Sequence, residues 1–339
     1  MSMMEAVFKK QREAFEKQVE EQNRGYRKPQ KINIERNIQY GEDKLQTFDM
    51  IYPTDAKPDI PVIINIHGGG LVMGDKDFNT RFNIRMAQNG YLVISVNYRL
   101  VPEVTVFEQM QDVINGIETA RKHQEEEREV LRAIWGVTED EVNQSDKRKS
   151  KRDYDWGVPV YLTADSAGAY LALYILAVQG SPEVAREFKV RPMTTRITAA
   201  AFISGMFYTT RKDKIGLFMP KYLYGRGYKK ARFYPYINPT NPEIIKSLPA
   251  TLFVTSRSDM LHSYTVDVYE AAEKYGRYCT LIDYPKNKQL THAFSVFYPS
   301  LSESIHLMDE ICEFFNSNKI AYRQNAFILY QAVIQKQER

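Results

Sequence analysis

Cysteine is scarce in this sequence: Cys279 and Cys312 are the only two among 339 residues. So few cysteines exclude a disulfide scaffold, and their spacing matches no metal-ligand motif. We expect both to be thiols of the protein core.

Charge of one sign and long hydrophobic runs are missing as well. The 46 Lys and Arg residues nearly balance the 42 Asp and Glu residues and leave a net charge of +4, which argues against a nucleic-acid or membrane-surface partner. No apolar run approaches the roughly 18–20 residues that cross a bilayer, and the N-terminus lacks the continuous apolar segment of a signal peptide. We expect a soluble, cytoplasmic protein without a membrane span.

Hydrophobic residues make up 43% of the chain, enough for a large core. Near the N-terminus they recur at helical spacing, which predicts an amphipathic helix that packs on the body of the protein and ends by Gly25. The residues on its apolar face are Met4, Phe8, Phe15 and Val19.

Farther along, short apolar runs alternate with helical stretches. This alternation favours one α/β domain with a mostly parallel, doubly wound sheet, whose first two strands form an antiparallel edge. The predicted strands are 31–40, 45–52, 62–66, 91–96, 158–163, 197–203, 250–255 and 278–284, and the predicted helices are 77–89, 103–134, 167–179, 261–275 and 301–316.

Three segments depart from this alternation. Residues 124–156 are very polar, with an acidic start and a basic cluster, and a solvated surface insertion explains them better than a nucleic-acid tag does. Residues 206–240 are rich in Tyr, Phe and Lys, which is more typical of a small packed subdomain than of a platform for stacked bases. The tail at 318–339 predicts an extra amphipathic helix that covers the body or a partner subunit, and so admits a homo-oligomer.

A strand, a turn of small residues and a helix follow one another around Ser166. The segment Ala164–Gly168 (ADSAG) closely matches the G-x-S-x-G nucleophile elbow, in which small residues allow a turn that raises the serine hydroxyl above the sheet edge. Ala164 stands where the pattern has its first glycine. Taken alone, the segment fits an ordinary strand-to-helix turn with a capping serine equally well.

Three consecutive glycines follow an apolar strand and His67. Consecutive glycines cost backbone entropy, and a loop that points its N–H groups into a cleft explains them better than a flexible turn. Such N–H groups stabilise the oxyanion that forms in acyl transfer. The expected donors are Gly69, Gly70 and, just after the serine, Ala167. Gly68 is a further candidate donor, and we expect His67 to organise the loop.

A serine nucleophile needs a base within hydrogen-bond reach and an acid that orients this base. After an elbow of this kind the acid comes first along the chain and the histidine second. His292 lies in the loop between the last predicted strand and the last predicted helix, where it can reach the carboxyl edge of the sheet. His262 comes too early, and His306 lies inside a predicted helix.

The best-placed acid is Asp259, one loop after the strand at 250–255. Asp267 lies within a predicted helix and Asp283 within a predicted strand, so both are placed less well. Asp259 also fits the N-cap of the helix that follows, and one residue can fill both roles.

These blocks resemble the hormone-sensitive-lipase-like branch of the α/β-hydrolase esterases. Five blocks stand in the family's order: HGGG at 67–70, NYRLVPE at 97–103, DSAG at 165–168, Asp259 with Leu261, and His292. The resemblance covers roughly residues 45–317. It implies an α/β-hydrolase fold with a cap built from residues 1–30 and 206–240.

The resemblance further implies a serine carboxylic ester hydrolase that cleaves small, short-acyl esters through an acyl-enzyme and needs neither metal nor cofactor. Its triad is Ser166, Asp259 and His292. The residues expected to line the acyl pocket are Leu71, Val72, Phe207, Tyr208, Phe218 and Phe294.

Three alternatives stay open. The same triad serves an amide or formamide hydrolase. A non-catalytic ligand-binding member of the family is a second alternative, against which the presence of His292 argues. The third is a scaffolding role for the polar insertion and the tail.

Overall fold

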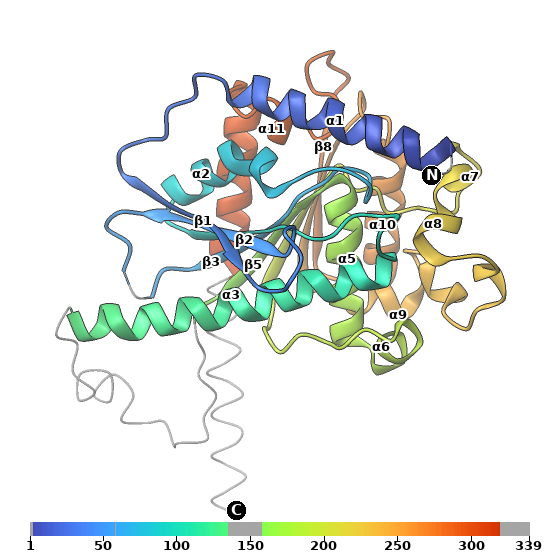
Figure 1. The fold of residues 1–339 in the computed structure, drawn as a ribbon. Helices are drawn as coiled ribbons and strands as arrows, with labels where there is room; N and C mark the ends of the chain where they lie inside the picture. Colours follow the sequence, from blue (N-terminus) through green and yellow to red (C-terminus); the bar gives the residue numbers. More distant parts are fainter. Residues whose placement is uncertain (1–2, 58, 135–157, 319–339) are drawn as a thin grey trace, which may run out of the picture.

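The computed structural model describes residues 3–57, 59–134 and 158–318, and eight strands form one sheet through the middle of the protein (Figure 1). The strand order is β1-β2-β4-β3-β5-β6-β7-β8. The pairs β1–β2 and β2–β4 are antiparallel and the other pairs are parallel, which confirms the predicted sheet and its antiparallel edge. The strands are β1 Ile32–Gln39, β2 Thr47–Pro53, β3 Val62–Ile66, β4 Leu92–Val96, β5 Val160–Asp165, β6 Ala199–Ile203, β7 Ala250–Ser256 and β8 Cys279–Tyr284.

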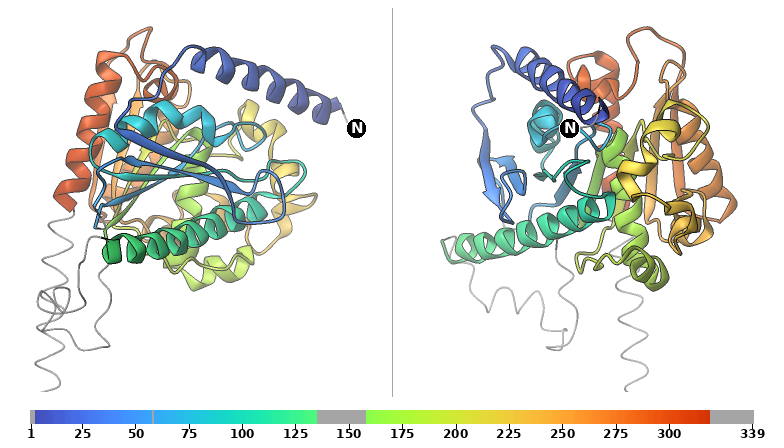
Figure 2. Two further views of the ribbon diagram at one scale, coloured as in Figure 1. Left: turned by 60° about the vertical axis from the view of Figure 1, so that its left-hand side comes forward. Right: turned by 45° about the vertical axis from the view of Figure 1, so that its right-hand side comes forward.

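Helices cover both faces of the sheet (Figure 2), so each central strand feeds two cores. In β3, Val62, Ile64 and Ile66 belong to the core beneath α3, α5 and α10, whereas Ile63 belongs to the core beneath α2 and the helix over 302–318. Burial on both faces explains why these strands are apolar throughout instead of alternating. The helices are α2 Thr80–Gln88, α3 Val106–Ile134, α5 Ser166–Gly180, α6 Pro182–Phe188, α9 Pro242–Ile245, α10 His262–Lys274 and α11 Phe294–Phe297.

The eight predicted strands and the helices predicted between residues 77 and 316 are present, and their bounds differ at the ends. The helix predicted over 77–89 begins as a 3-10 turn, η1 Lys76–Asn79, before α2. Sequence reasoning missed α6, although Ser181 caps it and Pro182 stands in its first turn, a recognisable start signal. Part of the polar insertion, up to Ile134, continues α3; the rest of that insertion and the predicted helix at 318–339 fall almost entirely outside the described residues.

The N-terminal helix α1 (Met3–Asn23) runs along one side of the molecule (Figure 1) and packs on it through the predicted face. Phe8 is buried against Tyr222 of α8, with ring centroids 5.3 Å apart, and Phe15 against Phe78 of η1 at 4.8 Å. The helix therefore bridges the segment that follows β6 and the segment that follows β3. None of the described helices is long and apolar enough to span a membrane.

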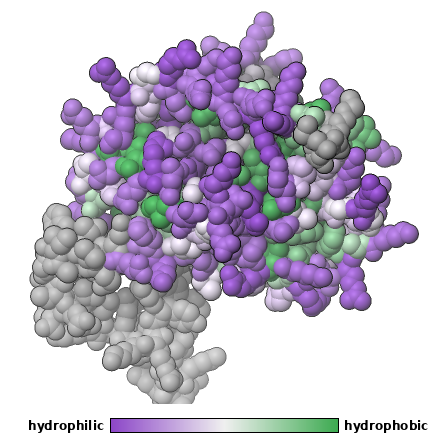
Figure 3. Space-filling model, in the orientation of Figure 1, coloured by the Kyte–Doolittle hydropathy of each residue, from purple (hydrophilic) through white to green (hydrophobic). Residues whose placement is uncertain are grey.

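The segment between β6 and β7 folds into short helical turns. Its aromatic residues pack on one another and on the body, as Phe233 does on Phe107 and Phe188, which agrees with a small packed subdomain. Leu217 and Phe218 of α7 remain 74% and 47% exposed, and Figure 3 shows apolar side chains on this side of the molecule. The turns are α7 Lys214–Phe218, α8 Pro220–Tyr224, η2 Tyr228–Lys230 and η3 Tyr234–Ile237.

The two thiols differ in their surroundings. Cys312 is buried, with Sγ 3.6 Å from the Met86 sulfur, and burial raises its pKa to about 11. Cys279 is half-buried at the start of the edge strand β8. The expectation of core thiols is therefore correct for Cys312. Cys279 packs against the core but is only partly buried, because an edge strand has no neighbour on its outer side.

Candidate active site

The turn between β5 and α5 places Ser166 at the carboxyl edge of the sheet. Strand β5 ends at Asp165 and α5 begins at Ser166, whose φ of +50° lies in the left-handed region. The turn is tight, because a Cβ on Gly168 would lie 2.2 Å from the Ile66 carbonyl oxygen. A strained non-glycine residue that close packing holds in place is common at functional sites.

A chain of two hydrogen bonds joins Ser166, His292 and Asp259. Nε2 of His292 lies 2.9 Å from the Ser166 Oγ, and its Nδ1 lies 2.8 Å from Oδ1 of Asp259. The same Oδ1 accepts the Leu261 N–H at 2.8 Å. The N-cap of α10 is Leu261, and no side chain caps this helix, so the alternative role of Asp259 as its N-cap is wrong. These three residues come from the loops after β5, β7 and β8, as the topology predicts.

The electrostatics of Asp259 favour its charged form. Its side chain is fully buried, and burial by itself raises the pKa of a carboxyl. The hydrogen bond to His292 and the charge of that ring outweigh burial, so the pKa of Asp259 lies below its ordinary value. An ionised carboxylate can hold the imidazole in one tautomer, with Nε2 free to accept a proton from Ser166.

The candidates that the sequence ranked lower have other partners. His262 hydrogen-bonds Asp283 at 3.0 Å, and Asp267 forms an ion pair with Arg211. His306 lies 3.7 Å from Glu310, four residues on along the same helix. The structure thus brings together Ser166, His292 and Asp259 and none of these four lower-ranked candidates.

Ser204 supports the histidine loop and was not foreseen. It stands directly after β6, and its hydroxyl accepts the N–H of Ala293 at 3.0 Å. Ala293 has a φ of +48°, so this bond fixes a strained residue directly after His292. The Ser204 hydroxyl also contributes to lowering the pKa of Asp259. A serine at a strand end was the signal available in the sequence, but it does not tell which loop lies opposite.

The glycine loop closes on itself directly after β3. Gly69 and Gly70 have φ values of +117° and +63°, and a Cβ on Gly69 would lie 2.0 Å from the Met73 carbonyl oxygen. That carbonyl belongs to a turn in which the Met73 N–H donates to the Gly69 carbonyl at 3.0 Å. Within the described residues, the N–H groups of Gly69 and Gly70 donate to no acceptor. Both groups are therefore free to bind a ligand.

Gly68 lies against the end of β5. A Cβ on Gly68 would lie 2.4 Å from Oδ2 of Asp165, whose Oδ1 accepts from Nδ2 of Asn79 at 2.8 Å. Gly68 stays a candidate donor to an oxyanion. The remaining expected donors are Gly69, Gly70 and Ala167, the last in the first turn of α5, where helix N–H groups lack intrahelical partners.

His67 lies under the glycine loop with both ring nitrogens engaged. Nδ1 lies 2.7 Å from the Gly68 carbonyl oxygen and Nε2 lies 2.8 Å from Oδ1 of Asn97. Its ring stacks on Tyr98 at 4.4 Å, and the Tyr98 hydroxyl donates to the His67 carbonyl at 2.8 Å. These contacts are those of a residue that organises the loop, and they explain why the block at 97–103 accompanies the glycines.

The six residues expected to line an acyl pocket do not form one surface. Leu71, Val72 and Phe207 belong to the core on the α5 side of the sheet, and Phe294 belongs to the core on the opposite side. Each of these four is at most 4% exposed, because residues just beyond strand ends turn inward between sheet and helices. Tyr208 is half-buried under the Arg211 guanidinium, and Phe218 is exposed. Phe207 and Phe294 are therefore residues of two different cores.

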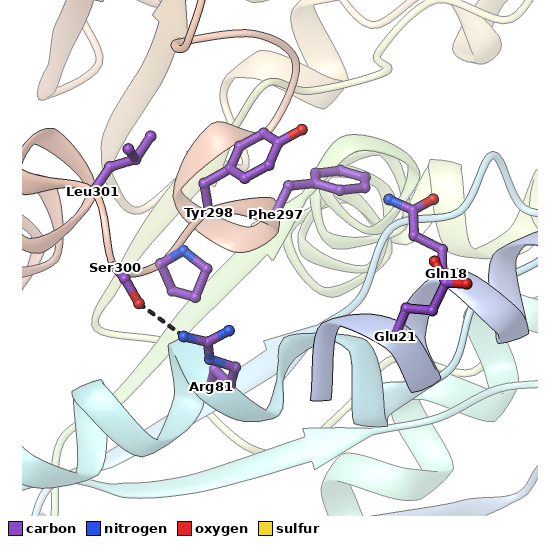
Figure 4. Close-up of a pocket in the computed structure, with 8 residues that line it drawn as sticks. Gln18, Glu21, Arg81, Phe297, Tyr298, Ser300 and Leu301 are labelled. Atoms are coloured by element: carbon purple, nitrogen blue, oxygen red, sulfur yellow. Dashed lines mark hydrogen bonds between the residues drawn. The ribbon is translucent and has the colours of Figure 1, made fainter. Parts of the chain in front are cut away.

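The structure also has a pocket of about 540 Å³ (Figure 4). It is formed by Gln18 and Glu21 of α1, Arg81 of α2 and the residues 297–301, and Arg81 donates to the Ser300 hydroxyl across it at 2.7 Å. None of the predicted site residues lines it. Among the described residues, no three His, Cys, Asp or Glu side chains gather as a metal-binding group.

Solved structures share this architecture. An inhibited esterase B from Lactobacillus rhamnosis matches with a TM-score of 0.77 at 22% identity, over 96% of this chain and 99% of that one. A bacterial heroin esterase matches with a TM-score of 0.64 at 16% identity, over 91% and 90%. At these identities the likeness shows the fold.

Two named relatives match part of the chain. A probable isoprenylcysteine alpha-carbonyl methylesterase of Oryza sativa subsp. japonica is 26% identical over 170 residues, and a kynurenine formamidase of Danio rerio is 23% identical over 171. Each match covers 50% of this chain but only 34% and 45% of the relative. Residues 63–295, more than half of the sequence, match the α/β-hydrolase fold family as a whole. The chain therefore belongs to that family, which confirms the resemblance seen in the sequence.

Proposed function

We propose that this protein is a serine ester hydrolase with Ser166 as its nucleophile. The observation that carries the proposal is the pair of hydrogen bonds from Ser166 to His292 at 2.9 Å and from His292 to Asp259 at 2.8 Å. Nucleophile, base and orienting acid within hydrogen-bond reach are what acyl transfer to serine requires.

In the first half-reaction, the Ser166 oxygen attacks the ester carbonyl carbon while Nε2 of His292 takes the hydroxyl proton. The carbonyl oxygen becomes an oxyanion, which accepts from Gly69, Gly70 and Ala167. The tetrahedral intermediate collapses as its C–O bond to the leaving alcohol breaks, and the imidazolium protonates that alcohol. Asp259 keeps the imidazole oriented and stabilises the imidazolium, and an acyl group stays on Ser166.

In the second half-reaction, water replaces the alcohol. His292 takes a proton from the water, whose oxygen attacks the acyl carbon, and the new oxyanion uses the same donors. Collapse returns the proton to Ser166 and releases the carboxylic acid. Fixed donors at a developing oxyanion are worth about 2.7–4 kcal/mol each in such reactions.

The proposed substrate is a small ester with a short acyl chain. Residues 1–30 and 206–240 form the proposed cap: α1 contacts α8 through Phe8 and Tyr222, so the two segments meet. The name of the rice relative, a methylesterase, supports an ester substrate. Half-buried Tyr208 and exposed Phe218 are the remaining candidates for contact with the substrate.

Hydrolysis of nitrophenyl acetate, butyrate and octanoate by the wild type and by Ser166→Ala tests the proposal. We expect turnover that falls with chain length and disappears in the variant. A wild type that is no faster than Ser166→Ala would overturn the assignment and favour a ligand-binding protein of this fold.

Amide hydrolysis is the second candidate, because one relative is named a kynurenine formamidase. The triad serves either reaction, so its presence does not distinguish ester from amide hydrolysis. The rates on phenyl formate and formanilide distinguish them, because the two substrates share the acyl group. Without a catalyst, the ester hydrolyses faster than the amide in water. We expect the catalysed ratio of ester rate to amide rate to exceed this uncatalysed ratio by at least tenfold.

A further inference from the structure

Arg12 of α1 reaches the segment that follows the glycine loop. Its Nε donates to the Val72 carbonyl at 2.6 Å, and its Nη2 donates to the Val101 carbonyl at 2.7 Å. Nη1 and Nη2 also donate to the Glu103 carboxylate at 2.8 and 2.6 Å. One guanidinium thus joins the N-terminal helix to two loops at the carboxyl edge of the sheet.

The backbone that Arg12 holds is strained. Leu71 has a φ of +68°, in a region that L side chains rarely adopt, and it directly follows Gly70. Such a conformation persists only where the surroundings hold it. The Leu71 carbonyl accepts the Val101 N–H at 3.0 Å and the Gln109 amide at 2.9 Å. The next carbonyl, that of Val72, is held by Arg12 from 60 positions away in the chain.

We propose that Arg12 is a positioning residue of the active site. By fixing the Val72 carbonyl it keeps the strained turn closed, and the closed turn sets the direction of the Gly69 and Gly70 N–H groups. The inference rests on the proposed function, because these directions affect a rate only if the two groups stabilise an oxyanion. Arg12 acts through backbone carbonyls and touches no reacting atom.

The chemistry of the contact requires an arginine. A guanidinium presents several N–H donors in a rigid plane, whereas a lysine ammonium is a compact group that cannot span two carbonyls and a carboxylate with the same geometry. The ion pair contributes less, because the Glu103 side chain is 60% exposed and solvent screens it. Its hydrogen bond to Arg12 nevertheless lowers the pKa of Glu103, so the pair stays charged at neutral pH.

The helix has other anchors, which makes the effect of Arg12 separable from folding. Phe8 and Phe15 are buried on either side of it along α1, against Tyr222 and Phe78. Replacement of Arg12 therefore leaves α1 docked and removes only the clamp on the loop.

The experiment compares Arg12→Met, Arg12→Lys and Glu103→Gln with the wild type. Arg85→Met is the matched control, because Arg85 also forms a partly exposed ion pair, with Asp309, but joins α2 to the helix over 302–318 and contacts no loop of the site. We measure kcat and KM on nitrophenyl acetate, normalised by active-site titration with a phosphonate. We also measure Ki for a trifluoromethyl ketone, whose adduct with serine places an oxyanion among the same donors.

For Arg12→Met we expect kcat to fall by about 10–100-fold, because small displacements of fixed donors have effects of this size, with KM changed less than about threefold. The Ki of the ketone should rise by the same factor as kcat/KM falls. Arg12→Lys should recover part of the loss, Glu103→Gln should lose less than about threefold, and Arg85→Met should keep the wild-type kcat.

A lower melting temperature for Arg12→Met with unchanged kcat and Ki would overturn the inference and leave Arg12 a purely structural residue. If Arg12→Met does not fold, wild-type kcat and Ki in Arg12→Lys would overturn it equally. A wild type without Ser166-dependent turnover would overturn the proposed function as well. If the wild type is active and Arg12→Lys keeps its kcat and Ki, only the role of Arg12 is overturned.

Discussion

Nδ2 of Asn79, the last residue of η1, donates to the carboxylate of Asp165, the residue directly before Ser166, at 2.8 Å. This bond ties the segment that follows the glycine loop to the end of β5. The carboxylate is buried, since Asp165 is only 2% exposed. Asp165 thus helps to hold together the segments after β3 and β5, which carry the proposed site.

Asp165→Asn should reveal the cost of burying this carboxylate. Burial raises the pKa of Asp165 above its ordinary value of about 3.9, so the contribution of this group to stability is full below that value and is lost as pH rises through the folded pKa. Urea unfolding at pH 4 and pH 8 should show the wild type losing stability relative to the variant as pH rises. A difference that stays constant with pH would contradict this.

Asp259 should behave in the opposite sense. Its pKa is lowered in the folded protein by His292, so its contribution is present above the ordinary pKa and is lost as pH falls through the lower, folded pKa. The stability advantage of the wild type over Asp259→Asn should therefore shrink below about pH 4. At neutral pH, Asp259→Asn should lower kcat by about 10⁴-fold, because an amide favours the wrong imidazole tautomer. A variant within tenfold of the wild type would remove Asp259 from the triad.

Gly69→Ala should lower kcat by about 10²–10³-fold, the size of the loss when one oxyanion donor is removed. The added Cβ would meet the Met73 carbonyl oxygen at 2.0 Å, so the turn must open. Gly90→Ala is a matched control: Gly90 also has a positive φ, of +90°, but nothing lies within 4 Å of its Cβ position. The control should lose roughly 1–2 kcal/mol of stability, because an L side chain is unfavourable in the left-handed region, and should keep its kcat. Equal kcat values for the two variants would show that the turn does not position donors.

Cys312 should resist thiol reagents in the native protein. A pKa of about 11 leaves roughly one thiolate in a thousand at pH 8, and burial between α2 and the helix over 302–318 blocks access. Titration with a chromogenic disulfide should find Cys279 reacting first and Cys312 reacting only as the protein unfolds. Two thiols that react at one rate in the native state would contradict the placement of that helix.

The sequence was sufficient to predict that Ser166, Asp259 and His292 lie together, because all three follow strands whose order in a parallel sheet is constrained. Ser166 was marked by small neighbours, Asp259 and His292 by their places after β7 and β8, and each of these signals is local. The contacts of Arg12, Ser204 and Asp165 were not foreseen, since each joins segments that only the folded chain brings together.

The burial of the residues expected to line the acyl pocket could not be predicted for a related reason. Leu71, Phe207 and Phe294 all stand just beyond strand ends, where sequence indicates neither which face of the sheet a side chain meets nor whether a helix covers it. In the structure Phe294 packs edge-on to Tyr284 in one core, and Phe207 packs on Phe202 in the other.

The most direct test of the central claim is covalent labelling with an alkyl fluorophosphonate, which reacts with an activated serine. We compare the wild type, Ser166→Ala and His292→Gln. Peptide analysis identifies the labelled residue, and intact-mass analysis over time gives the rate at which the adduct forms. The account predicts one adduct per chain, on Ser166, that is absent in Ser166→Ala and forms at least about 10³-fold more slowly in His292→Gln, because the base that activates the hydroxyl is gone. An adduct on another residue, or labelling of Ser166 at an equal rate without His292, would contradict it.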